Sequence, residues 1–179
     1  MTAPDSSRDA LASVLRERLA CCRSATQELE AWCRAHGLPR ADGVRVRRHP
    51  GPDAPPPAAM ARLLGPRPGE PVRHRRVELV YGDVPLSQAD NWYLPDRLDV
   101  STRMRLETTD TPFGFAVAAL GPKRRTLALR APSALNGEWL FELDVLVTRH
   151  DGIPLAAIVE RYRATLVDFA RSEPATTES

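Results

Sequence analysis

An arginine and a glutamate on two separate apolar segments are the residues of this sequence best suited to chemistry. Arg75 lies two and four positions before Val77 and Leu79 in a predicted strand, so its side chain shares their apolar face. A cation on an inward face needs an anionic partner, either a ligand or an acidic side chain. Alternatively, Arg75 points into water together with Arg73. Arg76 takes the inward position if the register shifts by one residue.

Glu160 stands where the apolar segment 155–159 meets charged residues. A carboxyl group at the end of such a segment can be buried, and burial raises its pKa as a general acid requires. The alternative is an ordinary ion pair at the strand end with Arg161 or Arg163. The residues alone therefore leave open whether Arg75 binds an anionic ligand or an acidic side chain, and whether Glu160 is a buried acid or an ordinary ion-pair partner.

The elements that must position these residues are mainly β-strands. Alternating apolar segments flank a Gly-Asp turn at residues 82–83 and a second turn at residues 150–152, and each arrangement predicts a β-hairpin. Shorter segments with the same alternation add further strands. About six strands are expected, at residues 44–48, 72–81, 86–94, 125–130, 139–148 and 154–166. Successive hairpins imply an antiparallel sheet.

Helical periodicity predicts helices at residues 10–22, 24–36, 58–64 and 97–108, and Thr111-Pro112 opens a further helical turn. The expected fold class is α+β, with the helices packed on one side of the antiparallel sheet. The 179 residues suit a single domain over residues 10–170, between a flexible N-terminus (1–9) and a flexible tail (171–179).

Composition excludes several classes of protein. The 25 basic and 23 acidic residues leave a net charge of +2, and no basic stripe or DNA-reading motif supports nucleic-acid binding. No apolar segment is long enough to span a membrane, and the N-terminus resembles no signal peptide. The three cysteines form no disulfide framework and lie at no zinc-ligand spacing. We therefore expect a cytoplasmic monomer without metal, cofactor, nucleic-acid partner or membrane contact.

Three motifs in order resemble the chorismate lyase family over about residues 70–166. The first is the run from Arg75 to Leu86, RRVELVYGDVPL, with an alanine at position 89 and a proline at position 95. The second is Thr-Pro-Phe-Gly at residues 111–114, and the third is Gly-Ile-Pro-Leu at residues 152–155, which leads into Glu160. The resemblance implies an enzyme that splits chorismate into a hydroxybenzoate and pyruvate without metal or cofactor. It also implies that Arg75 binds a carboxylate and that Glu160 is essential for catalysis.

The resemblance extends to three further substrate-binding positions. Phe113 and Gly114 occupy the turn whose backbone, in that family, meets the ring hydroxyl of the product. Phe115 stands where the family often has a basic residue, so an extra anion contact there is not implied. Ala25 falls near the position of the flap residue between the first two helices, where the family has a larger apolar side chain.

Two groups of residues allow more than one interpretation. The cluster Lys123–Arg125 consists either of solvated residues that protect an edge strand or of ligand contacts, with Arg125 the better candidate for a contact. Asp90 and Asn91 interrupt an apolar strand beside aromatic residues. They either reshape the wall of a ligand site or mark a bulge with Trp92 in the core.

Two functions follow from these observations. The first is a chorismate pyruvate-lyase that makes 4-hydroxybenzoate or another isomer. The alternative is a non-catalytic domain that binds an aromatic carboxylate, like the UTRA ligand-sensing domains of bacterial repressors. Such sensors carry a DNA-reading domain of about 70 residues ahead of the ligand domain, whereas the residues before position 70 here are interrupted by prolines. Glu160 distinguishes the two, because only catalysis requires a pocket-facing acid.

Overall fold

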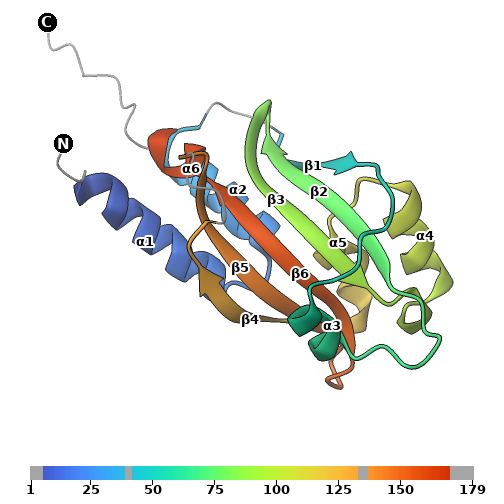
Figure 1. Ribbon diagram of the computed structural model, residues 1–179. Coiled ribbons are helices and arrows are strands. Elements are labelled where there is room, and N and C mark those ends of the chain that lie inside the picture. The colour runs from blue at the N-terminus through green and yellow to red at the C-terminus, as the bar shows by residue number, and fades with distance from the viewer. Residues whose placement is uncertain (1–5, 39–41, 133–136, 170–179) are drawn as a thin grey trace, which may run out of the picture.

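Hairpins formed from the alternating segments build one antiparallel sheet in the computed structural model, which describes residues 6–38, 42–132 and 137–169 (Figure 1). The strands are β1 (Val44–His49), β2 (Arg73–Tyr81), β3 (Val84–Tyr93), β4 (Lys123–Arg130), β5 (Trp139–Thr148) and β6 (Pro154–Arg163). Their order in the six-stranded sheet is β1-β2-β3-β6-β5-β4. The strand β6 therefore joins the β2–β3 hairpin to β5.

The described residues also form six α-helices. They are α1 (Ser6–Cys21), α2 (Ala25–Ala35), α3 (Ala58–Leu64), α4 (Val100–Thr108), α5 (Phe113–Ala116) and α6 (Thr165–Asp168). Short 3-10 turns occur at Pro95–Arg97 and Ala118–Leu120. The helix α1 begins within the N-terminal stretch expected to be flexible, while residues 1–5 and the expected flexible tail 171–179 lie outside the described residues.

The main core lies between the sheet and the helices α1 and α2. Leu15 and Leu19 of α1 and Leu29 and Trp32 of α2 are fully buried there against one face of the sheet. The Ser24 side chain caps α2 by accepting a hydrogen bond from the backbone N–H of Gln27 at 3.4 Å. The cap fixes the turn between the two helices over this face.

The helix α3 packs on the opposite face of the sheet, in front of β6 in Figure 1. Met60 and Leu64 of α3 bury themselves against Trp92 of β3 and Val159 of β6. The indole N–H of Trp92 donates to the backbone oxygen of Ala54 at 2.8 Å and so holds the proline-rich loop before α3. The predicted α+β class and antiparallel sheet are confirmed, but the helices cover both faces because α3 has its own apolar contact area.

No helix among the described residues is long and apolar enough to cross a membrane.

Candidate functional site

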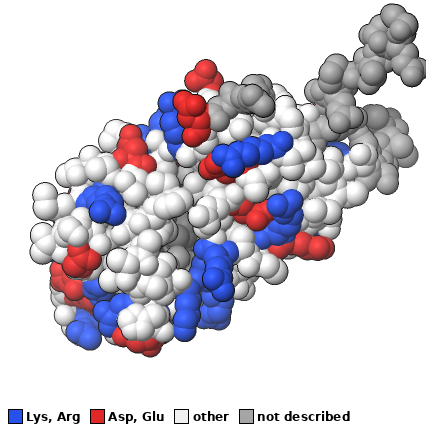
Figure 2. All heavy atoms as spheres, turned by 180° about the vertical axis from the view of Figure 1, so that it is seen from behind, with Lys and Arg blue, Asp and Glu red and all other residues white. Residues whose placement is uncertain are grey.

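A cavity of about 250 Å³ lies between the sheet and the helices α2 and α5. Figure 2 looks onto the helix-covered side of the molecule, whose surface is hollowed near its middle. Strand residues that point toward the helices form an apolar wall, consisting of Val46, Val77, Leu79, Ala89, Val147 and Ile158. Because alternate residues of a strand point to the same face, the wall follows directly from the predicted register.

The polar end of the cavity is built around Glu160. Its Oε2 atom accepts hydrogen bonds from Nη2 of Arg124 at 2.5 Å and from the hydroxyl of Tyr162 at 2.6 Å. Only 7% of the Arg124 side chain and 10% of the Glu160 side chain are exposed. Burial alone would lower the pKa of Arg124, but the charges of Glu160, Tyr162 and Cys22 and the hydrogen bond to Glu160 together raise that pKa. Burial is the main reason that the pKa of Tyr162 lies well above its usual value, and the negative charge of Glu160 is the second reason.

The helix layer closes the cavity with backbone and small side chains. Arg23, Ser24 and Ala25 line it from the turn between α1 and α2 and from the first turn of α2. Phe113 and Gly114 line it from α5. Amide groups in the first turn of a helix have no partner within the helix, so the start of α2 places hydrogen-bond donors at the cavity.

Of the residues predicted to form the site, Ala25, Phe113, Gly114 and Glu160 line this cavity. Arg75 is buried on the predicted face, but its guanidinium does not line the cavity. Its Nη1 and Nη2 atoms donate to the backbone oxygens of Thr111 at 2.9 Å and Thr109 at 3.0 Å.

Burial, followed by the nearby charge of Arg48, lowers the pKa of Arg75 to about 10. Its hydrogen bonds to Thr109 and Thr111 fix the segment that leads into α5, which lines the cavity. Arg75 therefore positions that segment and does not directly contact the cavity.

Two other predicted arginines point elsewhere. Arg76 lies on the opposite face of β2, where Nε donates to Oδ1 of Asp90 at 2.8 Å. Arg125 is exposed on β4, and its neighbour Arg124, whose side chain is nearly inaccessible, is the residue that lines the cavity. Both corrections have one cause, because adjacent residues of a strand point to opposite faces.

Sequence reasoning missed Tyr162 as a cavity residue and ranked Arg125 above Arg124, although Tyr162 and Arg124 are the residues that line the cavity. The available signal was alternation: Tyr162 lies two positions after Glu160, and Arg124 lies two before Thr126, which faces α1. For Asn91 the choice between ligand wall and bulge is resolved. The side chain lines the cavity, and β3 pairs regularly with β2 around it.

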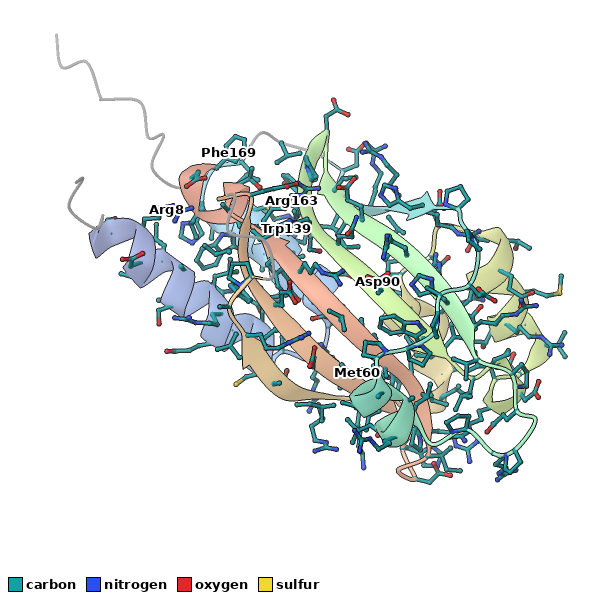
Figure 3. The ribbon with its side chains drawn as sticks, viewed as in Figure 1. Arg8, Met60, Asp90, Trp139, Arg163 and Phe169 are labelled. Carbon is teal, nitrogen blue, oxygen red and sulfur yellow. The ribbon has the colours of Figure 1, made fainter. Side chains whose placement is uncertain are left out.

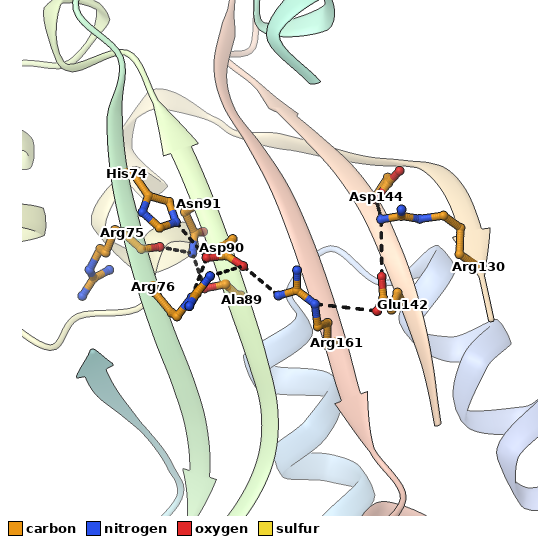
Figure 4. Close-up of polar contacts among 10 residues, drawn as sticks. All are labelled: His74, Arg75, Arg76, Ala89, Asp90, Asn91, Arg130, Glu142, Asp144 and Arg161. Atoms are coloured by element: carbon orange, nitrogen blue, oxygen red, sulfur yellow. Dashed lines mark hydrogen bonds and ion pairs between the residues drawn. The ribbon is translucent and has the colours of Figure 1, made fainter. Parts of the chain in front are cut away.

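The opposite face of the sheet carries a network of ion pairs (Figure 4). Asp90 accepts hydrogen bonds from His74 and Arg161, each at 2.7 Å, as well as from Arg76. Burial alone would raise the pKa of Asp90, but these donors, led by Arg76, hold it at about 2. Arg161 continues toward Glu142 at 3.6 Å, and Figure 3 shows Asp90 on the same side of the sheet as Met60 of α3.

Among the described residues, no group of three or more His, Cys, Asp or Glu side chains could hold a metal ion.

Solved structures share this fold at low sequence identity. The effector domain of PhnF from Mycobacterium smegmatis has a TM-score of 0.56 and 16% identity, over 78% of this chain and 88% of that one. PhnF itself, from the same organism, has a TM-score of 0.57 and 16% identity, over 87% and 80% of the two chains. YydK from Bacillus subtilis, described as a possible transcriptional regulator, has a TM-score of 0.50 and 11% identity, over 69% and 59%.

These comparisons overturn the predicted enzyme. Of the structures named above, one is described as an effector domain and one as a possible transcriptional regulator, so the predicted chorismate pyruvate-lyase activity is wrong. The geometry gives a physical reason, since Oε2 of Glu160 already accepts from a guanidinium and a phenol. In this structure Glu160 is therefore a hydrogen-bond acceptor within the protein.

A comparison of sequences places the chain more narrowly. No family model matches it. It is 35% identical over 181 residues to the uncharacterized protein y4mC of Sinorhizobium fredii (strain NBRC 101917 / NGR234), and the match covers 89% of this chain and 76% of that protein. The chain therefore belongs to the same family as the Sinorhizobium fredii protein, within the chorismate lyase-like fold that the PhnF effector domain also has.

Proposed function

We propose that this chain is a non-catalytic domain that binds a small aromatic carboxylate in the cavity beneath α2 and α5. The observation that carries the proposal is a hollow of about 250 Å³ with an apolar wall and one buried polar end. Pockets for drug-sized ligands measure about 300–1,000 Å³, so this one suits a smaller molecule. The description of the PhnF structure as an effector domain supports binding as the role of the fold.

The strand wall suits the ring of the ligand. Val77, Leu79 and Ile158 come from neighbouring strands and offer apolar side chains on one surface. At the polar end, the two donors described above both reach Oε2 of Glu160. We therefore assign Oε1 of Glu160 as the acceptor for a hydroxyl group on the ring.

The start of α2 suits the carboxylate of the ligand. Arg23 is exposed and lines the cavity immediately before the N-cap residue Ser24. Helix N-termini favour anions because their free N–H groups and the helix dipole both attract negative charge. The ligand then spans the cavity, with its carboxylate at Arg23 and its hydroxyl at Glu160.

Calorimetric titration of the whole chain with benzoate and 4-hydroxybenzoate tests this arrangement. We expect both to bind, and 4-hydroxybenzoate to bind more tightly. Hydrogen bonds to charged groups contribute about 1.5–3 kcal/mol, so 4-hydroxybenzoate should bind at least about tenfold more tightly than benzoate, and Arg124→Met combined with Glu160→Gln, which leaves no buried charge unpaired, should reduce that preference. Asp151→Asn, in the exposed β5–β6 turn, is the control and should change neither affinity. Failure of both compounds to bind would refute the proposal, and an equal loss for both would refute the role of Glu160.

A further inference from the structure

We propose that Arg124 is a positioning residue that couples occupancy of the cavity to the docking of α1 on β4, an inference that rests on the proposed binding function. The guanidinium of Arg124 contacts both the polar end of the cavity and the last turn of α1. A ligand held in the cavity therefore controls how firmly that turn stays attached to the sheet.

The contacts on the α1 side involve the backbone oxygens at the helix end. The last carbonyl groups of a helix have no partner within the helix. Nη1 of Arg124 donates to the oxygen of Leu19 at 2.9 Å and to that of Cys22 at 3.5 Å. The hydroxyl of Thr126 donates to the oxygen of Ala20 at 2.8 Å. Side chains of β4 thus complete the hydrogen bonding of this turn.

The contact on the cavity side uses the other terminal nitrogen of the same group. Nη2 of Arg124 pairs with Glu160, and both side chains are nearly inaccessible to water. A guanidinium is planar, so its two terminal nitrogens cannot be reoriented independently. Separating α1 from Arg124 therefore disturbs the ion pair, and breaking one partner of a buried pair is strongly unfavourable.

The cavity also depends on α1 through the chain itself. Arg23, Ser24 and Ala25 follow the end of α1 at Cys21 within four residues, and all three line the cavity. If the last turn of α1 leaves the sheet, this part of the wall leaves with it. A ligand that binds only the docked state favours that state by a factor of 1 + [ligand]/Kd.

Cys22 is a native reporter of this docking. It is partly buried, its thiol donates to the oxygen of Leu19 at 3.3 Å, and burial raises its pKa to about 11. Cys33 of α2 is fully buried and reports global unfolding. In a Cys21→Ser background, which removes the exposed thiol, alkylation by N-ethylmaleimide can be followed at each cysteine by peptide mass spectrometry.

Four results are expected. Without ligand, Cys22 is alkylated faster than Cys33. Saturating 4-hydroxybenzoate, at about 100 times its Kd, slows Cys22 alkylation at least tenfold. Arg124→Met combined with Glu160→Gln removes both buried charges together, and it accelerates alkylation of Cys22 about tenfold without changing that of Cys33. Arg125→Met, the exposed neighbour, leaves both rates unchanged.

The outcomes separate this inference from the proposed function. If 4-hydroxybenzoate binds in calorimetry and Cys22 alkylation is unchanged, the coupling is refuted while the binding function stands. An unchanged Cys22 rate in a folded double variant also refutes the coupling. If neither benzoate nor 4-hydroxybenzoate binds, the binding function fails, and the coupling fails with it. Should the double variant not fold, the ligand experiment on the Cys21→Ser protein decides the question alone.

Discussion

The two faces of the sheet treat buried polar groups in different ways. On the face covered by α3, Asp90 is surrounded by His74, Arg76 and Arg161, and its hydrogen bonds are saturated by protein donors. On the cavity face, Glu160 accepts from two donors at the polar end of the cavity. We call the face covered by α3 the ionic face and the face that carries Glu160 the cavity face. On the ionic face the protein itself supplies the hydrogen-bond donors to Asp90, whereas the cavity face combines an apolar wall with space for a ligand.

Neighbouring residues supply the two faces. Glu160 of β6 lines the cavity, while the next residue, Arg161, binds Asp90 on the other side. The same holds on β3 for Asn91 and Asp90. Because a shift by one residue would exchange the two sets, the ion pairs on one face fix the register that builds the cavity on the other.

The largest effect should come from breaking the ionic face at its centre. Asp90→Asn leaves Arg76 and Arg161 without their shared carboxylate, and loss of one partner from a buried network costs about 3 kcal/mol of the free energy of unfolding. Urea denaturation measures this change. Asp151→Asn, which removes an exposed partner of Arg149, is the matched control, with an expected change within about 0.5 kcal/mol. Equal effects would show that the ionic face does not stabilise the fold.

Acid should weaken the ionic face in a defined range. The pKa of Asp90 lies below its ordinary value of 3.8, at about 2, so the folded state favours the carboxylate. The stability due to Asp90 is therefore present above about pH 4 and is lost as the pH falls toward 2. The difference in unfolding free energy between the natural chain and Asp90→Asn should shrink as the pH falls below about 4. A constant difference down to pH 2 would contradict this.

A smaller and more local change should affect only the cavity face. Ala25→Leu adds volume at a position that lines the cavity in the first turn of α2, and leucine is a good helix former. We expect 4-hydroxybenzoate to bind at least tenfold more weakly, with the midpoint of urea denaturation almost unchanged. Ala31→Leu, on the exposed side of the same helix, is the control for both measurements. Unchanged affinity would place the ligand outside this part of the cavity.

The smallest effect is expected at Arg125. This side chain is exposed and belongs to neither face network, unlike its neighbour Arg124. Arg125→Met should change the unfolding free energy by less than about 0.5 kcal/mol, as surface substitutions usually do. The affinity of this variant for 4-hydroxybenzoate should stay within a factor of two of that of the natural chain. A larger loss of affinity would indicate that Arg125 contacts the ligand.

The sheet could be predicted because alternation and turn chemistry are local. The fifth strand, expected at 139–148, coincides with β5, but β6 ends at Arg163 and α6 follows, where a strand to residue 166 was expected. The buried Leu166 and Val167 fit either periodicity, so the pattern alone did not separate strand from helix there.

The site was less predictable because its polar contacts join distant segments. The face of Arg75 followed from alternation, but the direction of its guanidinium depends on the backbone oxygens of Thr109 and Thr111. Arg124 was passed over for Arg125, since its burial depends on Leu19 and Glu160, which lie far away in the sequence. The sequence around Arg75 and Arg124 therefore contains no pattern from which these contacts could be predicted.

The central place of β6 has a consequence for how this protein is made. This strand pairs with β3 on one side and β5 on the other, and it carries Ile158, Glu160 and Tyr162 of the cavity. During synthesis, the segments before Pro154 cannot assemble the complete sheet, however long translation pauses. Because residues of β6 line the cavity, the cavity can form only after the chain has been synthesised as far as Tyr162.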